Sequence, residues 1–246
     1  MSRSRHPSGP ARSFLPAIRI RSYLGLLAAL LVLFVVAPWL SVFTVLTIRV
    51  SDLLSLLVLV AGIHAVQRSL LSVVVIGLLA GGTVAFELLF HFGQGDLWAI
   101  LANFLALAFL LSLFLVIEFD VFTADTVTTE TLAGACCGYF LLAAIFASIY
   151  SILLQFDPGA LSLWPGATIV PSQLTFQNEE YGVLGYFSIA TLTTLGYGDI
   201  VPNSTATRST AAVEALIGQL YIAVVIARMI GMYIAGRDPG TSERPA

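Results

Sequence analysis

The chain has 246 residues, of which 58% are hydrophobic and only 10% are charged. It contains no lysine, and its 11 arginines and 14 acidic residues give a formal net charge of −3. Because so few charged side chains cannot cover a soluble surface, the composition excludes a soluble globular protein and predicts an all-α integral membrane protein. We expect its partners to include the lipid bilayer and no nucleic acid.

The first part of the chain predicts a polar arm followed by membrane spans. Residues 1–21 are rich in Arg, Ser and Pro without a convincing signal-peptide cleavage site, so we expect a disordered cytoplasmic arm. Most of the apolar segments that follow reach the ~20 residues needed to cross a bilayer. They are residues 23–40, 52–66, 70–90, 97–117, 131–154 and 209–235. A four-span membrane domain is thus predicted over residues 22–120, a second unit over 131–236 and a short cytoplasmic tail over 237–246.

The arginines decide between six spans and the five that would result if the first two segments formed one re-entrant unit. With six spans, both termini are cytoplasmic, and only Arg49 and Arg208 lie outside. The arginines then inside are Arg3, Arg5, Arg12, Arg19, Arg21, Arg68, Arg237 and Arg244. The acidic residues Glu118, Asp120, Asp125 and Glu130 fall in the predicted linker between the fourth and fifth spans. We therefore expect a six-span protein of the cell membrane.

The C-terminal unit contains a short motif between two helices. Residues 131–154 predict an outer helix, 157–181 a long polar connection, 184–194 a short helix and 209–235 an inner helix. Between the last two stands Thr193-Thr194-Leu195-Gly196-Tyr197-Gly198-Asp199. The run after it, residues 200–202, leads the chain away in an extended form, because Pro202 prevents an early helix.

This motif has the chemistry of a potassium selectivity filter. Glycine permits backbone conformations that other residues resist, so Gly196 and Gly198 allow successive carbonyl groups to turn to one side. Carbonyl oxygens aligned in this way can replace the water around K⁺, as in the TVGYG loops of potassium channels. We therefore expect Thr194, Leu195, Gly196, Tyr197 and Gly198 to bind K⁺, with Thr193 and Asp199 as support. Thr194 would add a hydroxyl ring below the carbonyls, and Tyr197 would brace the filter from behind.

Residues 184–235 resemble the pore domain of bacterial two-helix and two-pore-domain potassium channels. The longer stretch from about residue 119 to residue 228 resembles a family of small bacterial ion-channel proteins. The resemblance implies a homotetramer, since each chain supplies one filter strand. It also implies a glycine hinge at Gly218 and matches Arg208, whereas Ala190 replaces a pore-helix glutamate found in some of these channels. Inactivation that depends on that acid is therefore not expected.

The inner helix predicts further pore-lining residues. Steps of four from Gly218 give Ile222, Ile226 and Ile230, an apolar stripe that we expect to face the pore and form a gate; the alternative is that it packs on the outer helix. Glu214 stands one turn before Gly218. It either faces the cavity or, as the preferred interpretation, lies behind the filter near Ala190 and bonds to Thr191 or a backbone amide.

The sequence also argues against voltage gating by an arginine-containing fourth span. A voltage sensor needs several arginines in its fourth span, because each charge contributes only about 2.3 kcal/mol per 100 mV. No Arg or Lys stands between Arg68 and Arg208. We therefore expect the element that gates the pore to be part of the pore itself, to lie elsewhere in the membrane or to be supplied by an unknown partner.

Passive, K⁺-selective conduction is the function that these patterns favour. The alternative is a subunit of a K⁺ transporter or channel that acts with another protein, although such transporters typically carry four degenerate loops in one chain. A non-conducting regulatory subunit would be expected to lose the filter residues. No nucleophile–base pair, metal-ligand cluster or phosphate-binding loop is recognised in the sequence, so we expect neither an enzyme nor a cofactor beyond K⁺ in the filter.

Overall fold

The computed structural model describes residues 23–36, 58, 60–62, 70–93, 96–163, 167–168 and 180–235. The predicted arm, most of the second apolar segment, much of the 157–181 connection and the tail lie outside the described residues. The helices are α1 (Tyr23–Leu31) with a π-helical continuation η1 (Val32–Val36), α4 (Leu70–Gly93), α5 (Asp96–Thr123), α6 (Thr129–Phe156), α7 (Glu180–Leu192) and α8 (Thr205–Ala235).

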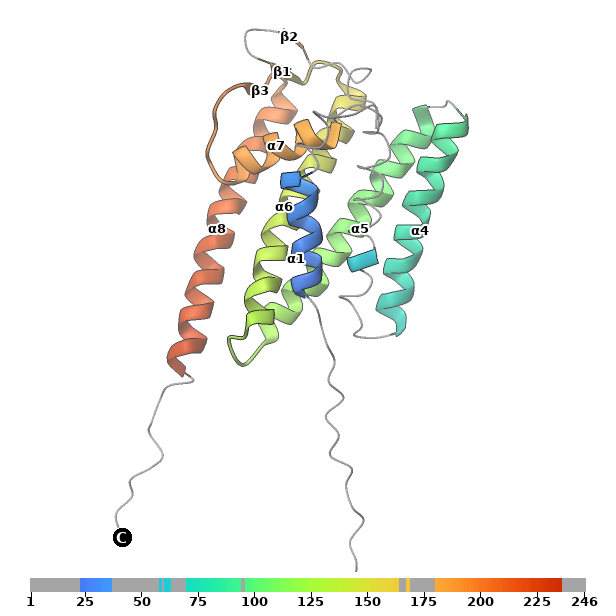
Figure 1. Ribbon diagram of the computed structural model, residues 1–246. Coiled ribbons are helices and arrows are strands. Elements are labelled where there is room, and N and C mark those ends of the chain that lie inside the picture. The colour runs from blue at the N-terminus through green and yellow to red at the C-terminus, as the bar shows by residue number, and fades with distance from the viewer. Residues whose placement is uncertain are drawn as a thin grey trace, which may run out of the picture.

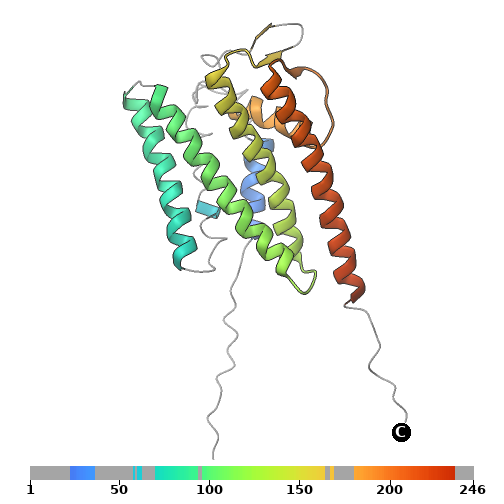
Figure 2. The ribbon, with the colours of Figure 1, turned by 180° about the vertical axis from the view of Figure 1, so that it is seen from behind.

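The long helices run side by side in a bundle. In Figure 1, α4 and α8 stand at opposite sides, with α1, α5 and α6 between them. Figure 2 shows the same order from behind, and both views place the short helix α7 near one end of α8. The two sides of the bundle therefore differ, because α8 and α7 form one side and α4 the other.

Three helices are long and apolar enough to cross a membrane by length and composition among the described residues. They are Ile100–Thr123, Thr129–Phe156 and Thr205–Ile234, and shorter apolar helices lie at Tyr23–Val35, Val73–Phe86 and Gly182–Leu192. The protein is thus a mostly helical membrane protein. The fifth and sixth predicted segments agree with α6 and α8 to within about four residues at each end.

Three predicted boundaries need correction. Helix α5 continues to Thr123, so Glu118 and Asp120 belong to this helix and not to a linker. Helix α7 ends at Leu192, before the predicted end at residue 194. Helix α8 begins before Arg208, which therefore lies within its first turns and not ahead of it. Helical hydrogen bonding extends past the apolar runs, because polar side chains at the ends of a helix do not interrupt it.

The N-terminal helix is part of the core of the bundle. Leu26 and Leu30 on α1 are fully buried in a hydrophobic cluster with residues of α4, α5 and α6. Tyr23 fixes the start of α1, since its hydroxyl donates to Asp120 at 2.7 Å and its main-chain N–H donates to Glu130 at 3.0 Å. The helices before the C-terminal unit therefore share a continuous core with its outer helix, α6.

A small sheet, which an all-α fold did not predict, closes one end of the molecule. Strands β1 (Leu161–Leu163), β2 (Ala167–Thr168) and β3 (Ile200–Pro202) are antiparallel in the order β2-β1-β3. The chain leaving α6 is thereby paired with the chain that follows the 193–199 motif.

The sheet continues into the start of α8. The carbonyl oxygen of Ala160 accepts hydrogen bonds from the main-chain N–H of Asn203 at 2.7 Å and the hydroxyl of Thr207 at 2.8 Å. The hydroxyl of Ser204 accepts from the N–H of Thr207 at 3.2 Å and so caps α8. This end of α8 is therefore fixed to the end of α6.

Candidate functional site: a backbone loop and its supports

The loop at residues 193–199 is held by the last turn of α7. The main-chain N–H groups of Leu195 and Gly196 both donate to the carbonyl oxygen of Ala190, at 2.8 and 3.1 Å. In a trans peptide, the N–H of one residue and the C=O of the preceding residue point in opposite directions. The carbonyl oxygens of Thr194 and Leu195 consequently point away from α7.

Backbone conformation alternates along the same loop. Thr194, Gly196 and Gly198 have φ angles of 58°, 51° and 77°, and Thr194 is the one non-glycine with positive φ among the described residues. The positive φ angles expected at the two glycines are therefore present. Thr194 adopts the same conformation in spite of its β-branched side chain, for which positive φ is unusual. This alternation at every second residue allows successive carbonyl groups to share one direction.

The whole loop is uncovered within a single chain. Residues 193–199 are all exposed, and the side chains of Leu195 and Tyr197 are 53% and 70% exposed. Tyr197 therefore does not brace the loop from behind within its own chain. A surface of this kind, with backbone carbonyl groups and large apolar side chains together, is unsuited to lipid.

Within the chain, a different tyrosine supports the end of the loop that contains Asp199. The hydroxyl of Tyr186 on α7 donates to Asp199 Oδ2 at 2.7 Å, while Asp199 Oδ1 accepts from the N–H of Ile200 at 3.0 Å. The hydrogen bond to the Asp199 carboxylate raises the pKa of Tyr186 to about 12, so the hydroxyl keeps its proton at neutral pH. The sequence did not indicate this pair, although Tyr186 belongs to the predicted short helix and Asp199 to the motif.

Glu214 is enclosed between three helices. It is fully buried on α8, where it accepts hydrogen bonds from Tyr150 of α6 at 2.7 Å and from Ser188 of α7. Ser188 also lies 2.8 Å from the carbonyl oxygen of Ala143. The predicted bond to Thr191 was wrong, because that hydroxyl donates within α7 to the carbonyl of Phe187. This burial agrees with the interpretation in which Glu214 lies behind the loop.

Gly218 makes the closest approach between α8 and α7. A Cβ atom at this position would collide with the carbonyl oxygen of Leu192, the last residue of α7. The same carbonyl accepts a hydrogen bond from the hydroxyl of Tyr139 on α6, at 3.2 Å. Helix α8 runs through Gly218 without interruption. The structure thus gives this glycine a packing role that the sequence did not indicate.

The two faces of α8 differ beyond Gly218. One face packs against the hydrophobic clusters of the bundle through Ile217, Tyr221, Val225 and Met229. The predicted stripe, Ile222, Ile226 and Ile230, is 39%, 52% and 53% exposed. These isoleucines are not among the described residues that pack against the hydrophobic clusters, which argues against the alternative of packing on the outer helix.

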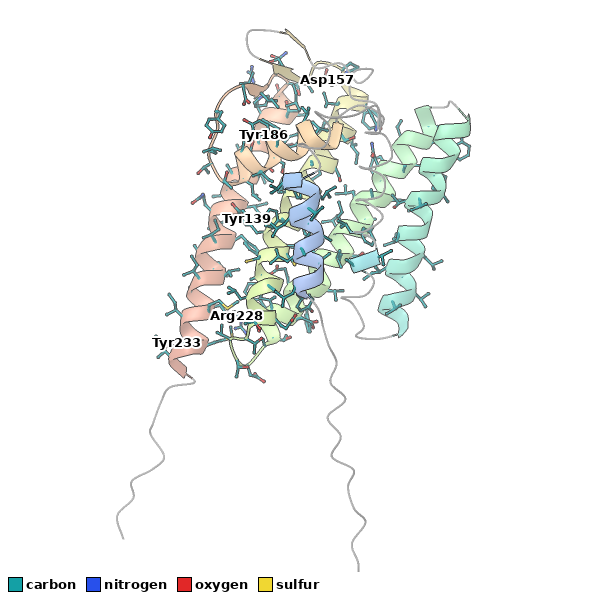
Figure 3. The ribbon with its side chains drawn as sticks, viewed as in Figure 1. Tyr139, Asp157, Tyr186, Arg228 and Tyr233 are labelled. Atoms are coloured by element: carbon teal, nitrogen blue, oxygen red, sulfur yellow. The ribbon has the colours of Figure 1, made fainter. Side chains whose placement is uncertain are left out.

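Two polar side chains of α8 make contacts in different parts of the molecule. Gln219 lies next to the loop, and its side-chain nitrogen is 3.4 Å from the hydroxyl oxygen of Thr194. Arg228 donates to the carbonyl of Ala124 at 3.0 Å and stacks on Phe122, with 5.7 Å between its guanidinium carbon and the ring centre. Figure 3 shows Tyr186 at the α7 end of the molecule and Arg228 near the other end of α8.

No group of three or more His, Cys, Asp or Glu side chains that could hold a metal ion occurs within the described residues.

Comparison with known proteins identifies the kind of domain to which these elements correspond. Residues 140–235 match a family described as "Ion channel", and this stretch includes most of α6 and all of α7, the loop and α8. No curated protein and no solved structure gave a significant match. The C-terminal part of this membrane protein is therefore similar to an ion-channel domain, and it consists of an outer helix, a short helix, a backbone loop and an inner helix.

Proposed function

We propose that the protein is a potassium-selective channel in which residues 194–198 form the filter. The observation that carries the proposal is the direction of the loop carbonyl groups. The N–H groups of Leu195 and Gly196 are directed toward Ala190 and φ alternates at Thr194, Gly196 and Gly198, so the carbonyl oxygens face away from the chain. A ring of such oxygens replaces the hydration shell of K⁺.

Four copies of the chain are needed to complete this site. One chain supplies one row of carbonyl groups and leaves all of residues 193–199 exposed. The exposed face of α8 continues below this row, with Leu216, Leu220 and Val224 each at least 50% exposed. A homotetramer around a central axis covers both surfaces, and Ile222, Ile226 and Ile230 then line the pore below the filter, where an apolar constriction gates by excluding water. Cross-linking and native mass spectrometry of the purified protein are expected to give four chains.

The filter is expected to open outward, with both termini in the cytoplasm of the cell that carries the protein. The distribution of arginines in the sequence supports this orientation. Cysteine variants in residues 1–21 are expected to react with a membrane-impermeant thiol reagent only after the membrane is permeabilised.

Recording of the purified protein in planar bilayers tests selectivity. With asymmetric KCl and NaCl, the reversal potential is expected to follow the K⁺ gradient, and Ba²⁺, which is close to K⁺ in size, is expected to block. A reversal potential that follows Na⁺ equally would contradict K⁺ selectivity. Silence of the protein alone, with current restored by a second protein, would instead favour a transporter or channel subunit that acts with a partner.

A pair of glycine variants separates the filter from general effects of substitution. At Gly198 a Cβ atom has free space within the chain, so the effect of Gly198→Ala comes from the positive φ angle of 77°. Gly182→Ala is the control, because a Cβ there also meets nothing and the residue lies in a helix. Conduction is expected to be lost in Gly198→Ala and kept in Gly182→Ala. Normal current from both variants would place the filter elsewhere.

A further inference from the structure

A buried carboxyl group joins α5 to the inner helix. Glu118 on α5 is 8% exposed, and its Oε1 atom lies 2.7 Å from the hydroxyl oxygen of Tyr221 on α8. The same hydroxyl oxygen lies 2.7 Å from the carbonyl oxygen of Ala135 on α6. Gly138 leaves room for this arrangement, because a Cβ atom there would collide with both Glu118 and Tyr221. Three helices therefore meet at these four residues.

The number of available protons indicates the state of Glu118. A tyrosine hydroxyl donates one hydrogen bond, yet Tyr221 has two acceptor oxygens at 2.7 Å. If Glu118 is ionised, the Tyr221 hydroxyl can donate to only one of the two oxygens, and the other contact at 2.7 Å holds two oxygen atoms with no proton between them. A neutral Glu118 resolves this, because its carboxyl O–H donates to Tyr221, whose own O–H donates to the carbonyl of Ala135.

The second carboxyl oxygen leads to the same conclusion. Glu118 Oε2 is buried and has no hydrogen-bond partner in the part of the chain that the structure describes. A buried carboxylate is costly without a cation or donors around it, whereas the carbonyl oxygen of a neutral acid costs much less.

Among the described residues, the groups found around the junction supply no positive charge to balance a carboxylate. Cys136 and Cys137 on α6 lie close enough to Tyr221 to interact with it electrostatically, and neither is a cation. On α1, the hydroxyl of Tyr23 is directed to Asp120. Farther along α8, Arg228 is bonded to a carbonyl of the α5–α6 turn.

We propose that Glu118 is a proton-binding site through which pH acts on the pore. When neutral, it holds α8 against α5 and α6 one turn beyond Gly218. Loss of the proton leaves two acceptors for the single O–H of Tyr221 and a buried charge that is stabilised only by entry of water, so the junction opens and α8 separates from α6. The proton site itself is independent of the proposed function, on which only the effect on current rests.

The protonation state can be measured without any conduction. Infrared spectra of the purified wild-type protein are expected to contain the C=O stretching band of a protonated carboxylic acid that is missing in Glu118→Gln. This band is expected to shift in D₂O and to disappear at high pH. Asp125→Asn is the matched control, because Asp125 is an exposed acid just beyond α5 and its removal leaves the band unchanged. Identical carboxylic-acid bands in wild type and Glu118→Gln would overturn the proposal.

The effect on the pore is measured by recording current from about pH 5 to about pH 9 on the inner side. Separation of α8 widens the proposed constriction, so wild-type current is expected to rise with pH. Glu118→Gln, a permanently neutral side chain that can still donate to Tyr221, is expected to lose this dependence while keeping K⁺ selectivity. A pH-independent wild-type current, or an unchanged pH profile in Glu118→Gln, would overturn the link between Glu118 and the pore and leave the filter proposal intact.

Discussion

Replacement of Glu214 by valine tests whether this acid stabilises the packing of three helices. Valine is similar in size to glutamate but accepts no hydrogen bonds, so Tyr150 and Ser188 both lose an acceptor. Ser188 still has the carbonyl of Ala143 at 2.8 Å, whereas no other partner of the Tyr150 hydroxyl is found among the described residues. Because Tyr150 is fully buried, its unsatisfied hydroxyl is expected to cost about 1–3 kcal/mol of unfolding free energy.

Substitution of the partner residue, Tyr150, lowers the unfolding free energy for the same reason. Tyr150→Phe leaves one oxygen of the buried Glu214 without a donor, again at about 1–3 kcal/mol. The double variant removes both polar groups, and neither unsatisfied group remains. Its loss of stability is therefore expected to be smaller than the sum of the two single losses by about 1–3 kcal/mol, within the range measured for residues in contact.

The free energy of unfolding is measured by adding increasing amounts of SDS and following the loss of helix by circular dichroism. Ser148→Ala is the control, since Ser148 is buried but donates only within its own helix, to Ala144 at 3.0 Å. Combined with Glu214→Val, it is expected to be additive to within about 0.5 kcal/mol. Additive losses for the Tyr150 and Glu214 pair as well would refute the role of this hydrogen bond.

Three further variants test other contacts of the site. Gly218→Ala forces α8 away from the carbonyl of Leu192 and is expected to destabilise the protein by about 1–3 kcal/mol in the same unfolding assay; unchanged stability would contradict the close approach. Tyr186→Phe removes the bond to Asp199, so current in bilayers is expected to decline faster during sustained recording, and an unaltered time course would argue against this support of the filter. Ile226→Cys is expected to react with thiol reagents applied from the inner side and to lose current; protection from the reagent would mean that this exposed face of α8 does not line the pore.

The elements that the sequence predicted best are those in which one local signal decides the structure. Long apolar runs gave α6 and α8 to within a few residues, since a membrane span is defined by its length and hydropathy. The glycines of the motif gave the backbone conformation at residues 196 and 198, because positive φ is a property of the residue type.

The contacts that could not be predicted join residues far apart in the chain. Strand β1 pairs with β3 about forty residues later, and neither three-residue strand has a recognisable pattern of its own. The partners of Glu214 come from α6 and α7, so their identity depends on how each helix is rotated about its axis. The sequence predicts a linker at Glu118, because the apolar run before it ends at Ile117, yet the helix continues and buries this acid against Tyr221.

The attachments of α8 fall into two sets, and this has a mechanical consequence. Its first half is fixed by Ala160, Glu214 and the contact at Gly218. Beyond Gly218 the helix continues for roughly 25 Å at 1.5 Å per residue, held to α5, α6 and the turn between them by Tyr221 and Arg228. Once these contacts open, a tilt of only about 10° near Gly218 displaces the far end by roughly 4 Å, and in the proposed tetramer four such displacements widen the pore at that end. The half of α8 before Gly218 can meanwhile stay rigid, so the proposed filter keeps its support while a gate moves on the same continuous helix.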